Sequence, residues 1–275
     1  GDQPAGWRIV GEKENILAYN KEKLIDYYKS HYSAQNTVIC VAGDVSQDQV
    51  EAKIKKYFGK ANLHKALNKP AVVEYQESPK VLLHYKKTDQ THFCLGVRAY
   101  NMNDKRKYAL NLIAVILGGN MSSRLFISVR ERHGLGYYIH TSADTTTDTG
   151  YLVTQTGIKN ESLEKAIGLI LNEYRSLKNK KITAKELKKA KDYLRGTTAL
   201  SLDSTDTLAS YYAGQEVMGE KVLTPEEKLK LIDKVSVNDI NEVAKDIFKN
   251  DKLNLSVIGP FEEKEKEKLQ KLLII

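Results

Sequence analysis

The stretch Ser236–Phe261, SVNDINEVAKDIFKNDKLNLSVIGPF, predicts one helix followed by one strand. Ser236 and Asp239 form a start that resembles a capping box, and an amphipathic helix follows. A polar break separates this helix from a short apolar strand that ends at Gly259. A second helical pattern, EEKEKEKLQKLLI, comes after the glycine. This order favours an α+β unit in which helices pack on a sheet.

The same plan occurs near the N-terminus, in NKEKLIDYYKSHYSAQNTVICVAGDV, residues 20–45. Gly43 aligns with Gly259 at an offset of 216 residues (259 − 43), and no gap is needed. Four apolar positions then face one another: Leu24 and Ile240, Tyr28 and Ala244, Tyr32 and Phe248, Val41 and Val257. The helical pattern QDQVEAKIKKYFG follows the first copy, as its counterpart follows the second. A gapless register over about 25 residues indicates an internal repeat.

The repeat predicts the domain organisation. If a unit is about as long as the offset, the second unit covers residues 69–275, and residues 1–68 are only the last part of the first unit. The front of the first unit, about 150 residues, would then be missing, which is an ordinary domain size. The polar stretch HKALNKPAVVEYQESPK, with Pro70 and Pro79, is typical of a linker.

The second unit mixes strands and helices without strict alternation. VLLHYKKTDQTHFCLGVRAY predicts two strands, and LGYYIHTSADTTTDTGYLVTQTGI predicts a hairpin with its turn at Asp148–Gly150. DKRKYALNLIAVILGG predicts a buried helix with Asp104 as N-cap, and MSSRLFISVRERHG predicts a helix that stops at Gly134. Four further helices are expected, over residues 162–178, 184–200, 205–218 and 225–234. We therefore expect an α+β fold with a mixed or antiparallel sheet flanked by helices.

Composition and charge limit the possible functions. The net charge is +8, but lysines alternate with glutamates on helical stretches, which is typical of solvated helix faces, so we expect no nucleic-acid partner. No run of about 18 apolar residues exists, and the first residues, GDQPAGWRIVG, lack the basic and apolar regions of a signal peptide, which predicts no membrane association and a cytoplasmic location. Cys40 and Cys94 lie in apolar runs and are expected to be buried free thiols.

The common catalytic motifs are absent from the sequence. None of the six histidines, among them His64, belongs to a His-x-x-Glu-His pattern. His92 and Cys94 would share one face of a strand, but two ligands are too few for a metal site. No Gly-x-Ser-x-Gly elbow, phosphate loop or dinucleotide fingerprint occurs. We therefore predict neither a metal site nor a catalytic residue within this chain.

One candidate remains, in Ser128–Tyr138, SVRERHGLGYY. Arg130 lies in the last turn of a predicted helix and Tyr137 among the first residues of the next strand, on either side of the Gly134 stop. An arginine near a helix C-terminus is stabilised by the helix dipole, so a structural role is one interpretation. The other is that guanidinium and phenol donors converge on a peptide carbonyl or a carboxylate. The residues alone leave both interpretations open.

The stretch ILGGNMSSRLFISVRERHGLGYYIHTS resembles the second half of pitrilysin/insulinase-type zinc metallopeptidases, in the branch of mitochondrial processing peptidase and bacterial processing-protease-like enzymes. Residues 1–45 resemble the end of that family's first half, so the resemblance covers the whole chain. It implies two homologous α+β halves that close around an unfolded peptide. It also implies that the second half grips the substrate backbone with an arginine and a tyrosine, matched here by Arg130 and Tyr137.

The resemblance places the zinc ligands in the part of the first half that this chain lacks. It implies a zinc endopeptidase that cleaves peptides or unfolded segments, of which this chain is the substrate-binding half and is inactive alone. The zinc-bearing partner would be the missing N-terminal half or a homologous subunit. An alternative is a non-catalytic partner subunit of a heteromeric peptidase in the same family.

Overall fold

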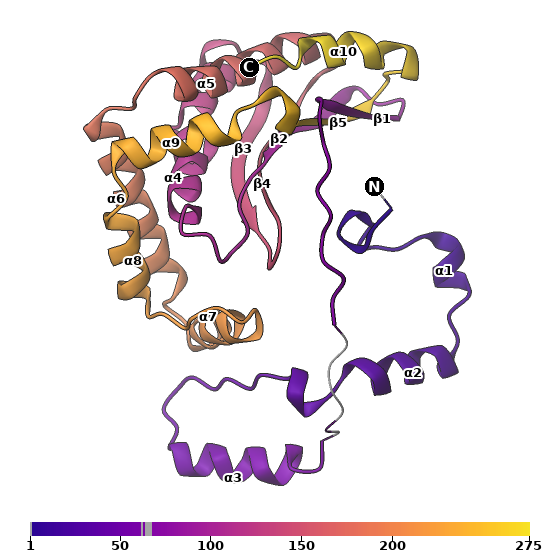
Figure 1. The fold of residues 1–275 in the computed structure, drawn as a ribbon, viewed down its shortest axis with the longest axis vertical. Coiled ribbons are helices and arrows are strands. Elements are labelled where there is room, and N and C mark those ends of the chain that lie inside the picture. The colour runs from indigo at the N-terminus through magenta and orange to yellow at the C-terminus, as the bar shows by residue number, and fades with distance from the viewer. Residues whose placement is uncertain (1, 62, 64–67) are drawn as a thin grey trace. The chain divides into compact units, whose positions relative to one another are not determined.

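The computed structural model describes residues 2–61, 63 and 68–275 (Figure 1). His64 and three further residues of the predicted linker lie outside the described residues. The chain divides into two compact units. The sheet unit comprises Glu74–Gly196 and Glu226–Ile275, and the N-terminal unit comprises Gly1–Val73 and Thr197–Pro225. The boundary that the repeat places between residues 68 and 69 remains a prediction.

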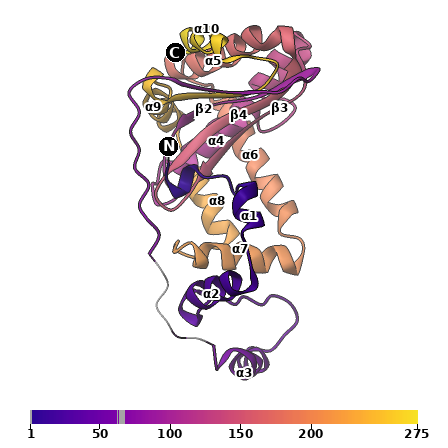
Figure 2. The same cartoon turned by 90° about the vertical axis from the view of Figure 1, so that its right-hand side faces the viewer.

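The sheet unit contains a five-stranded mixed sheet with the order β1-β5-β2-β4-β3 (Figure 1). Figure 2 shows its strands β2, β4 and β3 from a second direction. Only the pair of β1 and β5 is parallel; the other neighbours are antiparallel. The strands are β1 Lys80–Tyr85, β2 Gln90–Arg98, β3 Gly136–Thr145, β4 Gly150–Lys159 and β5 Leu253–Gly259. The predicted strand pair, the hairpin and the fold class are confirmed.

Helices cover one face of this sheet. Contacts join α4 to β3 and β4, α5 to β4, and α10 to β1, while α9 packs on α4 and α5 (Figure 1). The helices that lie in this unit or extend into it are α4 Lys107–Gly118, α5 Leu163–Asn179, α6 Ala184–Ser201, α8 Pro225–Asp233, α9 Val237–Ile247 and α10 Lys266–Leu272. Strand residues therefore alternate: Phe93, Leu95 and Val97 are buried, whereas Cys94 between them is exposed on the open face.

Tyr174 of α5 links the helical layer to the sheet. Its ring is fully buried and stacks on Phe248, at the end of α9, with 4.5 Å between ring centroids. Its hydroxyl donates to the Leu95 carbonyl at 3.1 Å and shares a hydrogen bond with Thr154 Oγ1 at 2.7 Å. Because a buried phenol would be costly without such partners, these bonds make the site specific for tyrosine.

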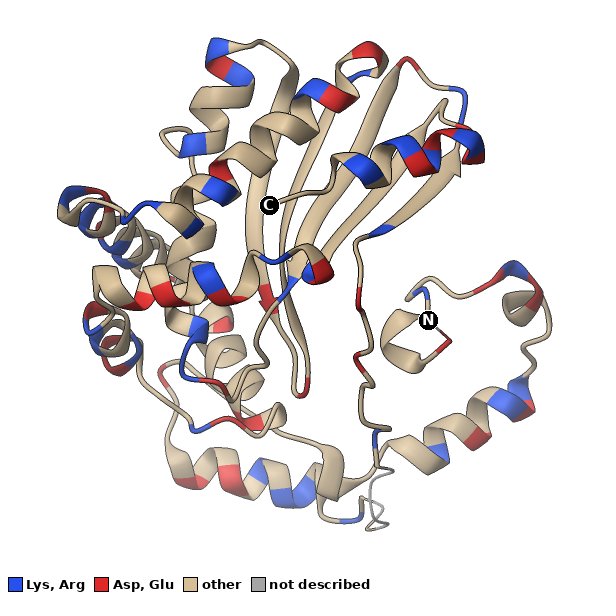
Figure 3. Ribbon diagram, turned by 45° about the horizontal axis from the view of Figure 1, so that its top comes forward, with Lys and Arg blue, Asp and Glu red and all other residues tan. Residues whose placement is uncertain are grey.

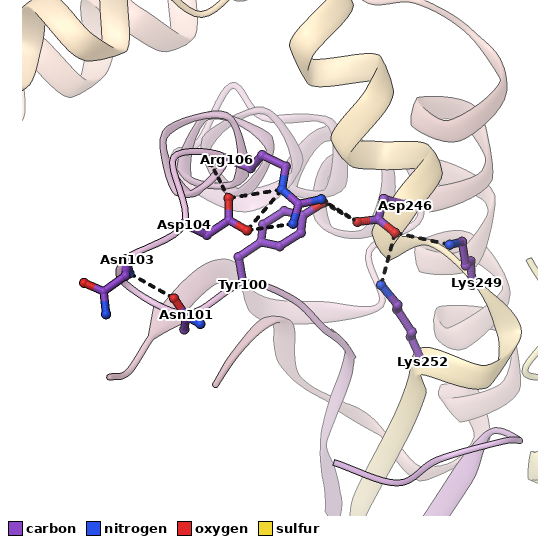
Figure 4. A network of polar contacts seen from close by, with 8 residues as sticks. All are labelled: Tyr100, Asn101, Asn103, Asp104, Arg106, Asp246, Lys249 and Lys252. Atoms are coloured by element: carbon purple, nitrogen blue, oxygen red, sulfur yellow. Dashed lines mark hydrogen bonds and ion pairs between the residues drawn. The ribbon is translucent and has the colours of Figure 1, made fainter. Parts of the chain in front are cut away.

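A polar network ties the connection between β2 and α4 to the end of α9 (Figure 4). Tyr100 donates to Asp246 Oδ2 at 2.7 Å, and its ring lies 3.9 Å from the Arg106 guanidinium carbon. Arg106 binds Asp104 with three hydrogen bonds and reaches Asp246 at 3.1 Å. Asp104 accepts from the Arg106 backbone N–H, so the predicted N-cap is wrong: Arg106 occupies that position, and Asp104 closes the turn before it.

The internal repeat is matched by the local structure. Helix α2 Lys21–His31 and helix α9 begin 216 residues apart (237 − 21) and end 216 residues apart (247 − 31). Asn20 caps α2 by accepting from the Lys23 N–H, as Ser236 caps α9 in a full capping box. Short 3₁₀ turns follow both helices at the same offset, Ala34–Asn36 and Asn250–Lys252.

The two copies differ where a partner strand is needed. Residues 37–43, which correspond to β5, form no strand, so the strand predicted in the first copy is wrong. In the sheet unit β5 lies between β1 and β2, whereas no described strand pairs with residues 37–43. A strand is defined by pairing, and local sequence does not supply a neighbour.

The remaining helices are α1 Lys13–Leu17, α3 Gln47–Phe58 and α7 Thr205–Val217.

Charged residues follow the helices and largely avoid the sheet. Figure 3 shows Lys and Arg intermixed with Asp and Glu along the helices, while the strands carry few of either. This agrees with the interpretation of the lysine-rich stretches as solvated helix faces.

Over the described ranges, no helix is both long and apolar enough to cross a membrane. Both cysteines are free, but the expected burial is wrong, since Cys40 is half-buried and Cys94 exposed.

Candidate functional site at the helix-to-strand corner

The helix before the corner is a π-helix over Phe126–Arg132, not the α-helix that the apolar spacing predicts. Val129 is fully buried and anchors it, and the Leu135 N–H donates to the Val129 carbonyl at 3.1 Å. Gly134 ends the helix with a φ of +59°, in the left-handed region that glycine adopts without strain, so the predicted stop is confirmed. A π-helical turn widens the backbone and is frequent at functional sites.

Arg130 occupies the last turn of this π-helix. Its guanidinium carbon lies 4.7 Å from the centroid of the Phe126 ring, which supports the side chain from below. Its side chain is 42% exposed, and its ion pair with the neighbouring Glu131 is long, at 3.9 Å. Among the described residues, none accepts a hydrogen bond from its guanidinium. The donors of Arg130 are therefore held in place and left accessible.

Tyr137 lies in a β-bulge at the start of β3. Gly136 pairs with Ile158 and Tyr138 with Gly157, so Tyr137 is the extra residue. Its side chain is 82% exposed, and no described residue forms a hydrogen bond with its hydroxyl. A bulge re-aims a side chain away from the regular alternation of the strand. In a regular strand Tyr137 and Tyr138 would point to opposite faces, and the bulge interrupts that alternation.

Two other polar residues of the corner, His133 and Tyr138, have structural partners. His133 Nδ1 lies 2.7 Å from the Ser128 carbonyl, so its ring closes the end of the π-helix. Tyr138 lies beside His92, with 3.1 Å between its hydroxyl and Nδ1. Partial burial raises the pKa of the Tyr138 hydroxyl, which therefore stays protonated at neutral pH. His133 and Tyr138 therefore have partners of their own, whereas Arg132 is exposed, as Arg130 and Tyr137 are.

Arg124 anchors the segment that leads into the π-helix, although it belongs to no recognised motif of the sequence. Its guanidinium binds both oxygens of Glu186 in α6, at 2.7 and 2.9 Å, and approaches Glu173 of α5 at 3.7 Å. Its side chain is only 22% exposed. A two-pronged contact of this kind fixes orientation as well as position. The sequence signal was one arginine in an otherwise uncharged stretch.

The described residues do not fit a zinc site. Protein zinc sites use three or four histidine, cysteine or carboxylate ligands. Within residues 2–61, 63 and 68–275, no group of three such side chains is arranged to hold a metal ion. Helix α4, KYALNLIAVILG, contains no potential ligand of that kind.

Comparisons with known proteins identify the family of this chain. A family model described as Peptidase M16 inactive domain matches residues 18–194. The chain is 31% identical to an uncharacterized zinc protease, YmxG, of Bacillus subtilis (strain 168), over 94% of this chain and 63% of the relative. It is 28% identical to an uncharacterized zinc protease of Mycobacterium leprae (strain TN), over 96% of this chain and 60% of the relative. The chain thus spans about three fifths of these curated relatives.

Solved structures share the fold. A protease from Helicobacter pylori matches with a TM-score of 0.82 at 20% identity, over 92% of this chain and 62% of that chain. A peptidase M16 inactive domain from Pseudomonas fluorescens matches with a TM-score of 0.82 at 22% identity, over 92% of this chain and 60% of that chain. The family expected from the sequence is confirmed. Because the family model covers more than half of the chain, this chain belongs to the peptidase M16 family, and the matched part is its inactive domain.

Proposed function

We propose that this chain is the substrate-gripping half of a zinc-dependent endopeptidase that cleaves peptides or unfolded segments. The observation that carries the proposal is the pair of accessible donors at one corner, Arg130 on a π-helical turn and Tyr137 on a β-bulge. Both irregularities hold a donor in place while leaving it open to a ligand. A guanidinium and a phenol both donate to peptide carbonyl oxygens. Donors held ready in this way stabilise negative charge as it develops on the oxygen of a cleaved bond.

The metal chemistry belongs to another half in this proposal, because the described donor set does not fit zinc. Zinc would polarise the scissile carbonyl and activate water when bound there. The residues of this chain bind and orient the extended substrate. This chain alone is accordingly expected to be inactive.

The N-terminal unit supports pairing with such a half. Apolar residues on α2 and at its C-cap are exposed where their counterparts on α9 and at its C-cap are buried: Leu24 is 58% exposed and Ile240 1%, and Tyr32 is 61% exposed and Phe248 0%. A cavity of about 490 Å³ lies beside Tyr32, between α2 and α3. Its floor includes Ser33, whose buried hydroxyl has no hydrogen-bond partner. In the sheet unit, the Tyr174 ring of α5 stacks on Phe248 at the corresponding position.

The partner is therefore an α+β half that supplies helices equivalent to α4 and α5 and strands equivalent to β1 and β2. It would reach this surface from the same polypeptide or as a separate zinc-bearing subunit. Apolar faces of this kind mark interaction surfaces in proteins.

The test uses the full-length parent with its zinc-bearing half. Arg130→Ala and Tyr137→Phe should each lower kcat/KM for an unfolded peptide by about 100-fold, the usual effect of removing one donor to a developing oxyanion. Zinc content should not change. Arg132→Ala is the matched control, an exposed arginine two residues along the same π-helix. Wild-type turnover in both variants would refute the proposed role.

A further inference from the structure

Two aromatic side chains meet above a glycine beside the Tyr137 bulge. Gly157 of β4 is the cross-strand partner of His92 on β2 and of Tyr138 on β3. The two rings reach over it from opposite sides, with centroids 6.2 Å apart and an interplanar angle of 26°. The Tyr138 hydroxyl and His92 Nδ1 lie 3.1 Å apart, within hydrogen-bond distance. The rings thus bridge three strands.

This bridge requires glycine in the middle strand. A Cβ atom on Gly157 would lie 2.9 Å from Cε1 of His92 and 2.9 Å from Cε1 of Tyr138, closer than carbon atoms approach. The bulge brings a second glycine close, since a Cβ on Gly136 would lie 2.4 Å from the Gly157 carbonyl oxygen. Rings that cover a strand glycine in this way help to set strand register.

Tyr138 is fixed through its backbone as well as its ring. The Thr156 hydroxyl donates to the Tyr138 carbonyl at 2.6 Å. Tyr137, one residue earlier, has no such support and is 82% exposed. Because neighbouring residues share one backbone, the direction of the Tyr137 side chain depends on how firmly Tyr138 is held.

We propose that His92 and Gly157 are positioning residues, which hold Tyr138 across β4 and thereby direct Tyr137 toward the substrate. The inference rests on the proposed function, in which Tyr137 binds the substrate backbone. His92 acts through Tyr138 and does not itself touch the substrate. The chemistry served is stabilisation of the negative charge that develops on the peptide oxygen, by a phenol donor whose direction is set in advance.

The test measures peptide cleavage by the full-length parent carrying His92→Ala, Tyr138→Phe or Gly157→Ala. Loss of one net hydrogen bond predicts a fall in kcat of about 3- to 10-fold for His92→Ala and Tyr138→Phe, with KM within about twofold. Gly157→Ala should cost at least as much, because both rings must move. His92→Gln retains an acceptor for the Tyr138 hydroxyl and should recover most of the loss. His84→Ala, an exposed strand histidine on β1, is the matched control.

A double-mutant cycle separates positioning from a general structural effect. In the Tyr137→Phe background, His92→Ala should lower kcat less than twofold, since the donor that it directs is already absent. Equal losses in both backgrounds would overturn the inference, and so would wild-type kcat in His92→Ala and Tyr138→Phe when Tyr137→Phe is impaired. Wild-type turnover in Tyr137→Phe itself would instead refute the proposed function. If Gly157→Ala does not fold, the other variants still decide the question.

Discussion

Phe248 and Tyr32 occupy the same position in the two copies of the repeat, and their substitutions should have opposite consequences. Phe248 is fully buried against Tyr174. Tyr32 is 61% exposed, and its ring stacks on that of Tyr28, four residues earlier, with 5.0 Å between ring centroids. Phe248→Ala removes a core ring and leaves a cavity, which costs about 4 kcal/mol. Tyr32→Ala removes an exposed ring, and its effect on the chain alone should stay within about 0.5 kcal/mol.

The predicted effects of both substitutions on the stability of the chain alone are measured by urea unfolding of the purified chain. Far-UV circular dichroism follows mainly the sheet unit, where most of the helices and all five strands lie. Trp7, the only tryptophan, reports on the N-terminal unit by fluorescence. Phe248→Ala should lower the unfolding midpoint of the sheet unit, equivalent to a fall of about 10 °C in Tm for a domain of this size.

The predicted effect of Tyr32→Ala is tested by measuring the Kd for a separately produced zinc-bearing half. There Tyr32→Ala should weaken binding by about 2 kcal/mol, which is about 30-fold in Kd, because the ring would fill a pocket as Phe248 does in the sheet unit. Phe248→Ala should affect binding only where it unfolds the chain. Equal destabilisation of the isolated chain by both substitutions would refute the reasoning, and so would unchanged binding by Tyr32→Ala.

Two further predictions concern polar contacts of the sheet unit. Partial burial would raise the pKa of Asp246, but hydrogen bonds from Tyr100 and Lys249 outweigh it and lower the pKa to about 2. This carboxylate therefore stabilises the fold at pH values above about 4, the pKa of the group in the unfolded chain. Its contribution to the free energy of unfolding, about 1 kcal/mol after solvent screening, is lost as the pH falls from about 5 to 2. Asp246→Asn should flatten that part of the curve of unfolding free energy against pH, and an unchanged slope would contradict the assignment. Arg124→Ala should lower the free energy of unfolding, measured in urea, by about 2 kcal/mol, because Glu186 loses both of its charged hydrogen bonds. Arg124→Lys should restore only part of that loss. Full recovery with lysine would show that the two-pronged geometry of the arginine contact is unimportant.

Most of the fold could be predicted from the sequence, because its signals are local. Capping residues, apolar periodicity and turn glycines predicted the four helices between residues 162 and 234 to within about one residue, and they predicted the hairpin. The unpaired segment 37–43 could not be predicted, since strand formation depends on a neighbour that is distant in sequence. The exposure of Cys94 was missed for a related reason: an apolar run does not show that one face of its strand stays open.

The candidate site was predictable in its residues but not in its geometry. Arg130 and Tyr137 were singled out by their residue types on either side of the Gly134 stop, and the family resemblance then favoured a substrate-binding role, which stays a prediction. The π-helix and the bulge that present them left no periodic signal, since each is a departure of about one residue from regular structure. His92 and Gly157 lie on other strands, so only the register of the sheet brings them to Tyr138.

The two copies of the repeat also separate what local sequence determines from what packing adds. Helix α2 keeps the length, cap and following 3₁₀ turn of α9 although its apolar face is exposed. A docking surface that already has its helix needs less ordering when a partner binds, and ordering is a main cost of association. Only residues 37–43 would have to gain strand pairing. Pairing with the proposed zinc-bearing half should therefore add strand structure at those residues while leaving α2 unchanged. The reason is that the local sequence is sufficient to form the helix, whereas the strand needs neighbouring strands from the other half.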